Sequence, residues 1–398
     1  MFFFLSGGAI IAIGWTTYFY IIFLAILAGC FLLSRKRLKA SAPALRNILI
    51  MGSFFTVLML LRGESIAFQD NGTIILKFAI LIVFSIYVAT FFGTNELFFT
   101  SLVSVFEFLI KLSLATFVIT NVVPSLLVNI GPKTVLGDQF QTLFGIAYAR
   151  SADFLKYKFY RNQSIFWEPG VFSVFIIITY MLKVFYLKNR KRMFWYILAI
   201  FSTLSMGGIT IFMLMLVSRF LFAGSTKQFN EKLPALALLV GVPLFAIVDF
   251  IYSYSSDIEL LAGALFHRNL SSDTSVNTRY QDLYYGFLAS KNKIWAGHGQ
   301  DFTDFYNTTA AAINSSKESY NGGITNAIIA ILFCYGIFFL CYYIYNMFKS
   351  SIELSSNSRY ALIMFFTLIG ALMLEPLHFS LAILFIFTFR ESKKTLLT

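Results

Sequence analysis

The sequence predicts an all-α polytopic membrane protein, and three observations support this fold class. Charged residues make up only 13% of the 398 residues, against about 25% in a soluble domain. Hydrophobic residues make up 58% of the chain. Apolar runs of roughly 20 residues, the length that a helix needs to cross about 30 Å of hydrocarbon, recur from one end of the chain to the other. We therefore expect one transmembrane domain over residues 1–398, with no separate soluble domain.

The apolar runs predict about eleven transmembrane helices. The expected spans are residues 9–33, 47–61, 74–92, 102–123, 168–187, 193–206, 208–223, 234–252, 322–346, 360–374 and 377–389. The apolar start, MFFFLSGGAIIAIGW, has no preceding basic region and no cleavage signal. We interpret it as part of a retained first span rather than as a signal peptide.

Basic residues predict the orientation of these helices. The segments SRKRLK (34–39) and KNRKR (188–192), with RESKK near the C-terminus, are dense in Lys and Arg. Because such loops stay in the cytoplasm, we place all three there. With an odd number of spans, the N-terminus then lies outside. The formal net charge of +12 is thereby explained by topology and does not indicate nucleic-acid binding.

Two outer loops, residues 124–167 and 253–321, are longer than connectors between packed helices need to be. They also carry basic residues that the positive-inside tendency does not predict. An anionic ligand at the outer membrane surface would explain them. These residues are Arg150, Lys156, Lys158 and Arg161 in the first loop, and Arg268, Arg279, Lys291 and Lys293 in the second.

The larger loop contains NTRYQDLYYGFLASKNKIWAGHGQDF, whose first part has helical apolar spacing. The apolar side chains are Tyr280, Leu283, Tyr284, Phe287 and Leu288. Such a helix is expected to lie flat in the membrane interface. It is followed by Gly297, His298 and Gly299, where the absence of flanking β-carbons would let a substrate approach the ring.

Arg279 and His298 suit transfer from a lipid diphosphate, since a planar cation grips phosphate oxygens and a neutral imidazole accepts a hydroxyl proton. Two simpler interpretations stay open. A loop histidine can merely be solvated, and an arginine beside a membrane can extend to headgroup phosphates.

The smaller loop ends in YRNQSIFWEPGVFSVF. Pro169 suits the first position of a helix, and Glu168 immediately before it would face the positive end of the helix dipole. Functionally, Arg161 could add a phosphate contact and Glu168 could orient an arginine or act as a base. An ordinary helix start explains the same pattern equally well.

A third group of ionisable residues lies in LEPLHF, where Glu375 and His378 fall at a predicted outer turn between the last two helices. Ionisable groups at membrane depth are functional suspects, but exposure in a turn weakens that inference. Inside the predicted spans, we expect Lys77, Glu107, Lys111 and Lys183 to be paired or to line the bundle.

Several signals of other chemistry are missing from the sequence. No phosphate-binding GxxxxGK[ST] loop or GxGxxG turn occurs, and no DxD is present to hold the metal of a nucleotide sugar. No Cys or His spacing indicates a metal site. We therefore expect no cofactor and no metal.

These residues together resemble the bacterial O-antigen polymerases of the Wzy type, within the superfamily that also contains the O-antigen ligases. The resemblance lies in an arginine of a long periplasmic loop, Arg279, followed by Trp295 and a Gly-His-Gly triplet. It continues in RNQSIFWEPGVFSVF and in NGGITNAIIAILFCYGIFF, and it covers residues 160–345. One departure is LSMGGIT, where the family often has a basic residue beside the serine.

The resemblance implies a fold like that of the C-type glycosyltransferases and a place in the bacterial inner membrane, with the active site facing the periplasm. The implied reaction moves a growing glycan from undecaprenyl diphosphate to the non-reducing end of a new lipid-linked repeat unit. It needs no metal and no nucleic acid, and it leaves open a polysaccharide chain-length regulator as a partner.

The resemblance, together with the chemistry of the residues themselves, suggests roles for individual residues. His298 and Glu168 would be catalytic. Diphosphate or substrate would be bound by Arg279, Arg161, Tyr280, Gly297, Gly299, Glu375 and His378. An O-antigen ligase and a lipid-linked oligosaccharide flippase remain alternatives. For an enzyme we expect the charges at the outer surface, and for a transporter we expect them at the centre of the bundle.

Overall fold

A computed structural model gives the arrangement of the chain. It describes residues 16–34, 37–62, 71–130, 140–143, 147–154, 157–166, 168–189, 191–222, 285–299, 305, 326–355 and 358–375, and the single residues 377, 380, 383, 384 and 386.

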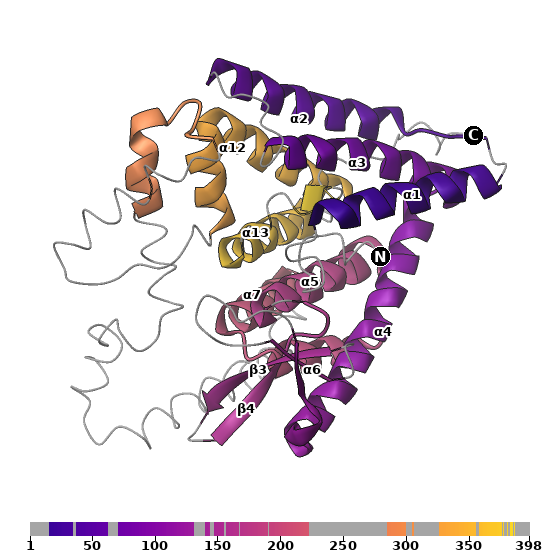
Figure 1. Ribbon diagram of the computed structural model, residues 1–398, viewed down its shortest axis with the longest axis vertical. Helices are drawn as coiled ribbons and strands as arrows, with labels where there is room; N and C mark the ends of the chain where they lie inside the picture. Colours follow the sequence, from indigo (N-terminus) through magenta and orange to yellow (C-terminus); the bar gives the residue numbers. More distant parts are fainter. Residues whose placement is uncertain are drawn as a thin grey trace.

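The described chain is mostly helical (Figure 1). In chain order, its α-helices are α1 (Thr16–Ser34), α2 (Ala42–Leu61), α3 (Asn71–Phe91), α4 (Asn95–Val122), α5 (Pro169–Met181), α6 (Met193–Ser202), α7 (Met206–Phe222), α12 (Ala327–Glu353) and α13 (Ser358–Leu374). A π-helical turn, η4 (Leu182–Tyr186), continues α5, and short 3₁₀ turns occur at η3 (Pro124–Leu126) and η5 (Lys291–Lys293).

Within the described ranges, five helices are long and apolar enough to cross a bilayer: α2, α3, α4, α5 with η4, and α12. The described parts of α1, α6, α7 and α13 are shorter apolar helices. The chain is thus a helical membrane protein. The predicted spans 234–252 and most of 377–389 lie outside the described residues, so the total of about eleven spans stays a prediction.

The helices begin where short polar side chains can satisfy the first backbone N–H groups. Thr94 accepts a hydrogen bond from the backbone N–H of Leu97 at the start of α4. Asn326 accepts from Ile328 and Ile329 at the start of α12, at 3.0 and 3.2 Å. At α5, Pro169 occupies the first helical position, as predicted, and its fixed φ favours helix initiation.

The segment predicted as the first outer loop contains a β-sheet that the all-α prediction did not include. Four antiparallel strands follow one another in the order β1-β2-β3-β4. They are β1 (Val128–Ile130), β2 (Phe140–Leu143), β3 (Ala147–Phe154) and β4 (Tyr157–Asn162). Only two residues separate β3 from β4, and Phe154 pairs with Tyr157 across them. Aromatic and β-branched residues with short connections favour such a meander, whereas the hydropathy of the spans carries no information about it.

α13 lies inside the bundle, where it packs against α12, α7 and α5 (Figure 1). α2 and α3 pack against each other and α2 also contacts α12, whereas the long α4 contacts α6 and the sheet. The core is rich in aromatic rings, for example Phe166 stacked on Phe175 at a centroid distance of 4.8 Å.

Several described basic residues, among them Lys39, Lys188 and Arg359, stand at one end of the bundle, which we call the basic end. Contacts between its turns define it. The backbone N–H of Lys39 donates to Thr90 at the end of α3. Phe99 of α4 packs on Tyr186 at 5.1 Å, and Phe185 packs on Tyr360 at the start of α13 at 5.2 Å. The described residues of the two predicted cytoplasmic segments, 34 and 37–39 in the first and 188–189 and 191–192 in the second, therefore belong to the same end. The sheet adjoins the other end of α4.

Candidate functional site

Three of the predicted site residues, Arg279, Tyr280 and His378, lie outside the described residues. The other six fall into two clusters. Arg161, Glu168 and Glu375 lie around the start of α5, whereas Gly297, His298 and Gly299 form a turn packed against α12. The two predicted catalytic residues, His298 and Glu168, therefore belong to different clusters.

The first cluster is built on the N-termini of two helices. We call it the carboxylate cluster and define it by Glu168, Gly170, Ser173, Ser205, Gly208 and Glu375. Glu168 has extended backbone angles, φ −145° and ψ 143°, and its carbonyl accepts the N–H of Phe172 at 3.2 Å. All thirteen residues of α5 are buried, so this helix begins inside protein rather than at a wet surface.

Glu375 reaches the start of α5 from the end of α13. Its side chain is buried, at 2% exposure. A β-carbon at Gly170 would collide with Oε1 of Glu375, so the carboxylate lies directly against the first turn of α5. The N-terminus of a helix presents backbone N–H groups and partial positive charge, which favour an anion at this position. Glu375 had been predicted in an exposed turn, and the structure buries it instead.

Glycine also lets the start of α7 approach α5. Ser173 donates its hydroxyl to the carbonyl of Gly170 at 2.6 Å. A β-carbon at Gly208 would collide with Ser173 and lie 3.2 Å from the hydroxyl oxygen of Ser205. Ser205 in turn accepts the N–H of Gly208 at 3.4 Å. Two helix N-termini, two serine hydroxyls and a buried carboxylate therefore meet in one place.

Arg161 on β4 is fixed beside this cluster by the end of α6. Its Nε donates to the carbonyl of Thr203 at 3.0 Å, and its Nη2 donates to the carbonyl of Leu204 at 3.2 Å. Helix C-termini carry partial negative charge and leave carbonyls unsatisfied, so an arginine is favourable there. These two bonds fix the plane of a guanidinium that has five N–H donors in total.

The segment between Arg161 and Glu168 is polar and buried. Asn162 donates to Ser113 at 3.2 Å and to Ser202 at 2.9 Å, which ties β4 to α4 and α6. Gln163 is fully buried, yet neither its side-chain nitrogen nor its oxygen has a hydrogen-bond partner in the described structure. An unsatisfied buried amide costs roughly 1–3 kcal/mol. Such a group is expected to be satisfied by water or by a ligand.

The second cluster holds the Gly-His-Gly turn against a break in α12. Gly336 has φ 76° and ψ 178° inside that helix, and Gly297 and Gly299 both have φ 75°. His298 and Gly299 donate their backbone N–H groups to the carbonyls of Phe333 and Cys334, at 2.7 and 2.9 Å. The turn thereby satisfies carbonyls that the break leaves open.

The His298 ring is part of this packing. It is 5% exposed and stacks on Phe333 with a centroid distance of 4.6 Å and an angle of 6°. Its Nε2 lies 3.0 Å from the carbonyl oxygen of Ala289. Because a carbonyl can only accept, Nε2 carries the proton in this contact. The His298 ring is therefore buried and held in one orientation by these contacts. The sequence predicts instead either a solvated loop residue or an accessible base.

Arg62, which the sequence analysis does not single out, holds the Gly-His-Gly turn against α12. Its Nη1 donates to the carbonyls of Ala296 and Cys334 at 2.9 and 2.6 Å. Its guanidinium carbon also lies 5.8 Å from the centre of the Tyr335 ring. An arginine directly after a span is usually assigned to headgroup contact, so its position gave no signal of this role.

A third ionic group lies near the basic end. Lys183 in η4 forms an ion pair with Glu107 of α4, and both side chains are largely buried, at 2% and 12% exposure. The exposed Arg192 brings Nη1 to 3.9 Å from the second carboxylate oxygen of Glu107. The expectation that Glu107 and Lys183 are paired is confirmed. Arg192 belongs to the basic end and its side chain reaches Glu107. The Glu107–Lys183 ion pair therefore lies close to the basic end.

The sequence signals for most of the carboxylate cluster are weak. The glycines of EPG and SMGG stand at helix starts, where small residues permit close approach, but the sequence does not show what approaches them. In the described ranges, no three His, Cys, Asp or Glu side chains lie close enough together to hold a metal ion. Comparisons with protein-family models, with curated proteins and with solved structures find no match to this chain.

Proposed function

We propose that this chain is a membrane-embedded glycosyltransferase that extends a polyprenyl-diphosphate-linked glycan, with the carboxylate cluster as its catalytic centre. The observation that carries the proposal is the buried Glu375 at the start of α5, beside two serines and the start of α7. A carboxylate inside an apolar bundle is costly, and its retention favours a functional role.

The cluster suits a reaction between a lipid diphosphate and a sugar hydroxyl. Glu375 would accept the proton of the acceptor hydroxyl as a general base, a role that typically contributes 10²–10⁴-fold to the rate. Glu168, at the same helix start, would orient the acceptor or an arginine. In the transfer, the acceptor oxygen forms a bond to the anomeric carbon while the carbon–oxygen bond to the diphosphate breaks.

The leaving diphosphate needs cationic and N–H donors. The N-termini of α5 and α7 supply backbone N–H groups, and Arg161 stands next to them with its plane already fixed. Charge grows on the diphosphate as its bond to the sugar breaks, so preorganised donors stabilise the transition state more than the ground state. The unsatisfied amide of Gln163 would bind a polar group of the sugar or the phosphate.

This proposal gives His298 a positioning role. Its ring is buried against Phe333 and hydrogen-bonded to a carbonyl, so it holds the Gly-His-Gly turn in place. Arg279 and Tyr280, in the same loop, keep their predicted role in binding the diphosphate. The ligase alternative differs only in the acceptor, so the length distribution of the products separates it from a polymerase.

The test is an assay of purified protein in nanodiscs with the native lipid-linked repeat unit, without nucleotide or metal, and with products resolved by length. A polymerase gives a ladder of longer lipid-linked glycans. We expect Glu375→Gln to reduce the initial rate at least about 100-fold. Glu96→Gln, an exposed carboxylate at the start of α4, is the matched control and is expected to keep the rate.

Two outcomes would contradict the proposal. A ladder that persists in Glu375→Gln would remove the carboxylate cluster from the chemistry. The absence of a ladder, together with transfer of the same lipid across proteoliposome bilayers, would favour the flippase. One observation supports that second candidate, since Glu107 and Lys183 form an ion pair inside the bundle. Their closeness to the basic end fits a structural pair better than a central transport site.

A further inference from the structure

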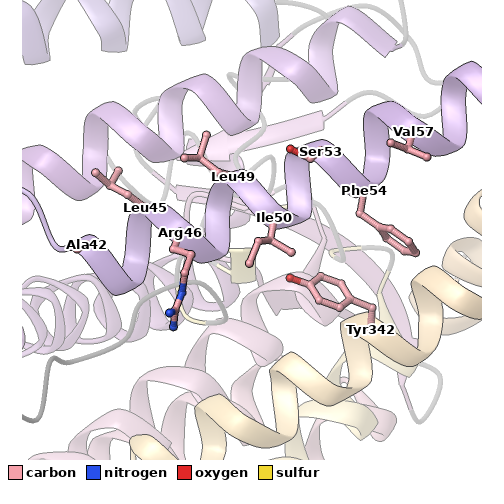
Figure 2. Close-up of a pocket in the computed structure, with 9 residues that line it drawn as sticks. All are labelled: Ala42, Leu45, Arg46, Leu49, Ile50, Ser53, Phe54, Val57 and Tyr342. Atoms are coloured by element: carbon pink, nitrogen blue, oxygen red, sulfur yellow. The ribbon is translucent and has the colours of Figure 1, made fainter.

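A groove opens between α2 and α12, on a side of the molecule that the proposed chemistry does not use. The open space of this groove has a volume of about 680 Å³. Figure 2 shows its wall, with Tyr342 of α12 facing a row of side chains on α2. The lining residues are Ala42, Leu45, Arg46, Leu49, Ile50, Ser53, Phe54, Val57 and Tyr342.

The groove follows one face of α2. Its α2 residues recur at intervals of three and four, which is the spacing of a single helical stripe. The residues that α2 buries in the core, among them Ile48, Met51 and Phe55, lie on another face. Leu49, Ile50 and Val57 remain 46–56% exposed. The stripe is therefore an apolar surface that the described bundle does not cover.

Aromatic packing closes the floor of the groove. Phe54 stacks on Phe339 with a centroid distance of 5.8 Å and an angle of 7°, and it packs on Tyr342 at 5.6 Å. In Figure 2 the hydroxyl of Tyr342 points toward the end of the groove that carries Arg46. The groove is thus an open trough along α2 with Tyr342 of α12 beside it, and its one charged lining residue, Arg46, lies toward one end.

The length of the groove matches one leaflet of a bilayer. Val57 lies eleven positions after Arg46, and at 1.5 Å per residue the two are about 16 Å apart along the helix axis. The hydrocarbon core is about 30 Å thick, so one leaflet contributes roughly half of that. An acyl chain that entered the groove from one membrane surface would end near Val57.

The positive charge of Arg46 favours a lipid with an anionic headgroup. Arg46 lies one helical turn inside α2 and is exposed, on the same end of the bundle as Arg37 and Lys39. In the described part of the chain it has neither a hydrogen-bond partner nor an ion-pair partner. Figure 2 shows its guanidinium extending from α2 on the side of the groove. Basic pockets between transmembrane helices on this side bind anionic lipid headgroups.

We propose that the α2–α12 groove is a binding site for an anionic phospholipid from the leaflet at the basic end. One acyl chain lies along Leu49, Ile50 and Val57, and the phosphate binds Arg46. The site is separate from the carboxylate cluster, and it does not depend on the proposed function.

Photoactivatable lipids test this site. The protein is reconstituted with phosphatidylglycerol or phosphatidylcholine that carries a diazirine at the end of one acyl chain, and labelled peptides are mapped by mass spectrometry. We expect the peptides with Phe54 and Tyr342 to be labelled roughly fivefold more by phosphatidylglycerol, the preference that one cation supplies. Arg46→Gln should remove the preference, whereas Arg37→Gln, an exposed arginine outside the groove, should keep it.

A second variant tests occupancy independently of charge. Ile50→Trp fills the groove and should abolish labelling at Tyr342 by both lipids, while labelling of the outer face of α4 continues. Equal labelling of the groove by the two lipids in the unmodified protein would overturn the proposal, because the groove would then hold ordinary boundary lipid. No labelling there by either lipid would overturn it as well, because another segment of the chain would occupy the groove.

Discussion

Two buried carboxylates occupy opposite halves of this bundle, and their surroundings differ in kind. Glu107 meets the ammonium of Lys183 directly, with Arg192 at 3.9 Å from its other oxygen. Glu375 instead lies against the first turn of α5, in contact with Gly170 and close to two serines. A carboxylate paired with an ammonium has its charge balanced by the protein, whereas one placed at a helix N-terminus sits where an anionic ligand would also bind.

Under the proposed function, this difference distinguishes a charge with a structural role from a charge with a catalytic role. The Glu107–Lys183 pair joins α4 to the π-helical end of α5, where the helix would otherwise have an ammonium buried in apolar surroundings. The carboxylate cluster joins three helix ends, and close contacts at glycine positions shape it. Mutations at the two places should therefore change different measured quantities, stability at the first and rate at the second.

The largest expected effect is on stability at Glu107. Glu107→Gln leaves the ammonium of Lys183, which is 2% exposed, without its counter-charge. Breaking a buried pair in this way destabilises by about 3–5 kcal/mol. Thermal unfolding in detergent should show the loss, and the double variant Glu107→Leu/Lys183→Met should recover most of it. If the double variant is folded yet transfers no glycan, the Glu107–Lys183 pair takes part in the activity, and its contrast with Glu375 as a purely structural pair is wrong.

The next effect is on rate at Gly170. Gly170→Ala places a β-carbon where Oε1 of Glu375 now lies, so the carboxylate must move. A displacement of about 1 Å at a reacting group can cost 10²-fold, and we expect a loss of that order in the initial rate. Gly52→Ala in α2 is the control, because its β-carbon would lie 3.6 Å from Phe78 in ordinary contact. Equal rates in the two variants would argue against a catalytic Glu375.

A smaller effect is expected at Gly297 in the Gly-His-Gly turn. Gly297→Ala puts a side chain at φ 75° and drives its β-carbon into the main chain of Cys334 and Tyr335. Gly93→Ala has a similar φ of 71° but nothing within 4 Å. Left-handed backbone costs roughly 1–2 kcal/mol in both variants. Calorimetry should therefore show a lower unfolding temperature for Gly297→Ala, and equal temperatures would mean that the turn does not dock on α12 as described.

The smallest expected effect concerns His298 itself. His298→Phe keeps a ring to stack on Phe333 and removes one hydrogen bond to Ala289. We expect a stability loss of about 1 kcal/mol. The rate per folded molecule should change less than about tenfold, since general-base catalysis typically accounts for at least 10²-fold. A rate loss above about 100-fold at nearly unchanged stability would instead identify His298 as the base, as the sequence first indicated.

Most of the helical architecture could be predicted from the sequence. Helices such as α2, α3 and α12 follow apolar runs whose length and composition admit little else in a bilayer, because every backbone polar group must be satisfied within the segment. The start of α5 at Pro169 was equally predictable, since proline suits only the first turn of a helix. The sheet at 128–162 was missed because hydropathy does not describe short strands outside the membrane.

The individual site residues were partly predictable. Arg161, Glu168 and Glu375 stood out because ionisable residues are rare in this chain, and the structure brings them to one helix start and its surroundings. Arg62 and Gln163 did not stand out. An arginine after a span and a glutamine in a loop are common, and only their burial and contacts distinguish them.

The sequence by itself determined that this is a membrane protein of packed helices, which residues begin several of them, and which few side chains can carry chemistry. These properties follow from composition and from local periodicity along the chain. Only the tertiary structure decided that Glu375 meets Gly170, that Lys183 neutralises Glu107, and that His298 is buried against a broken helix. Each of those contacts joins residues between 35 and 205 positions apart, and distances through space between such residues are set by packing rather than by spacing along the chain.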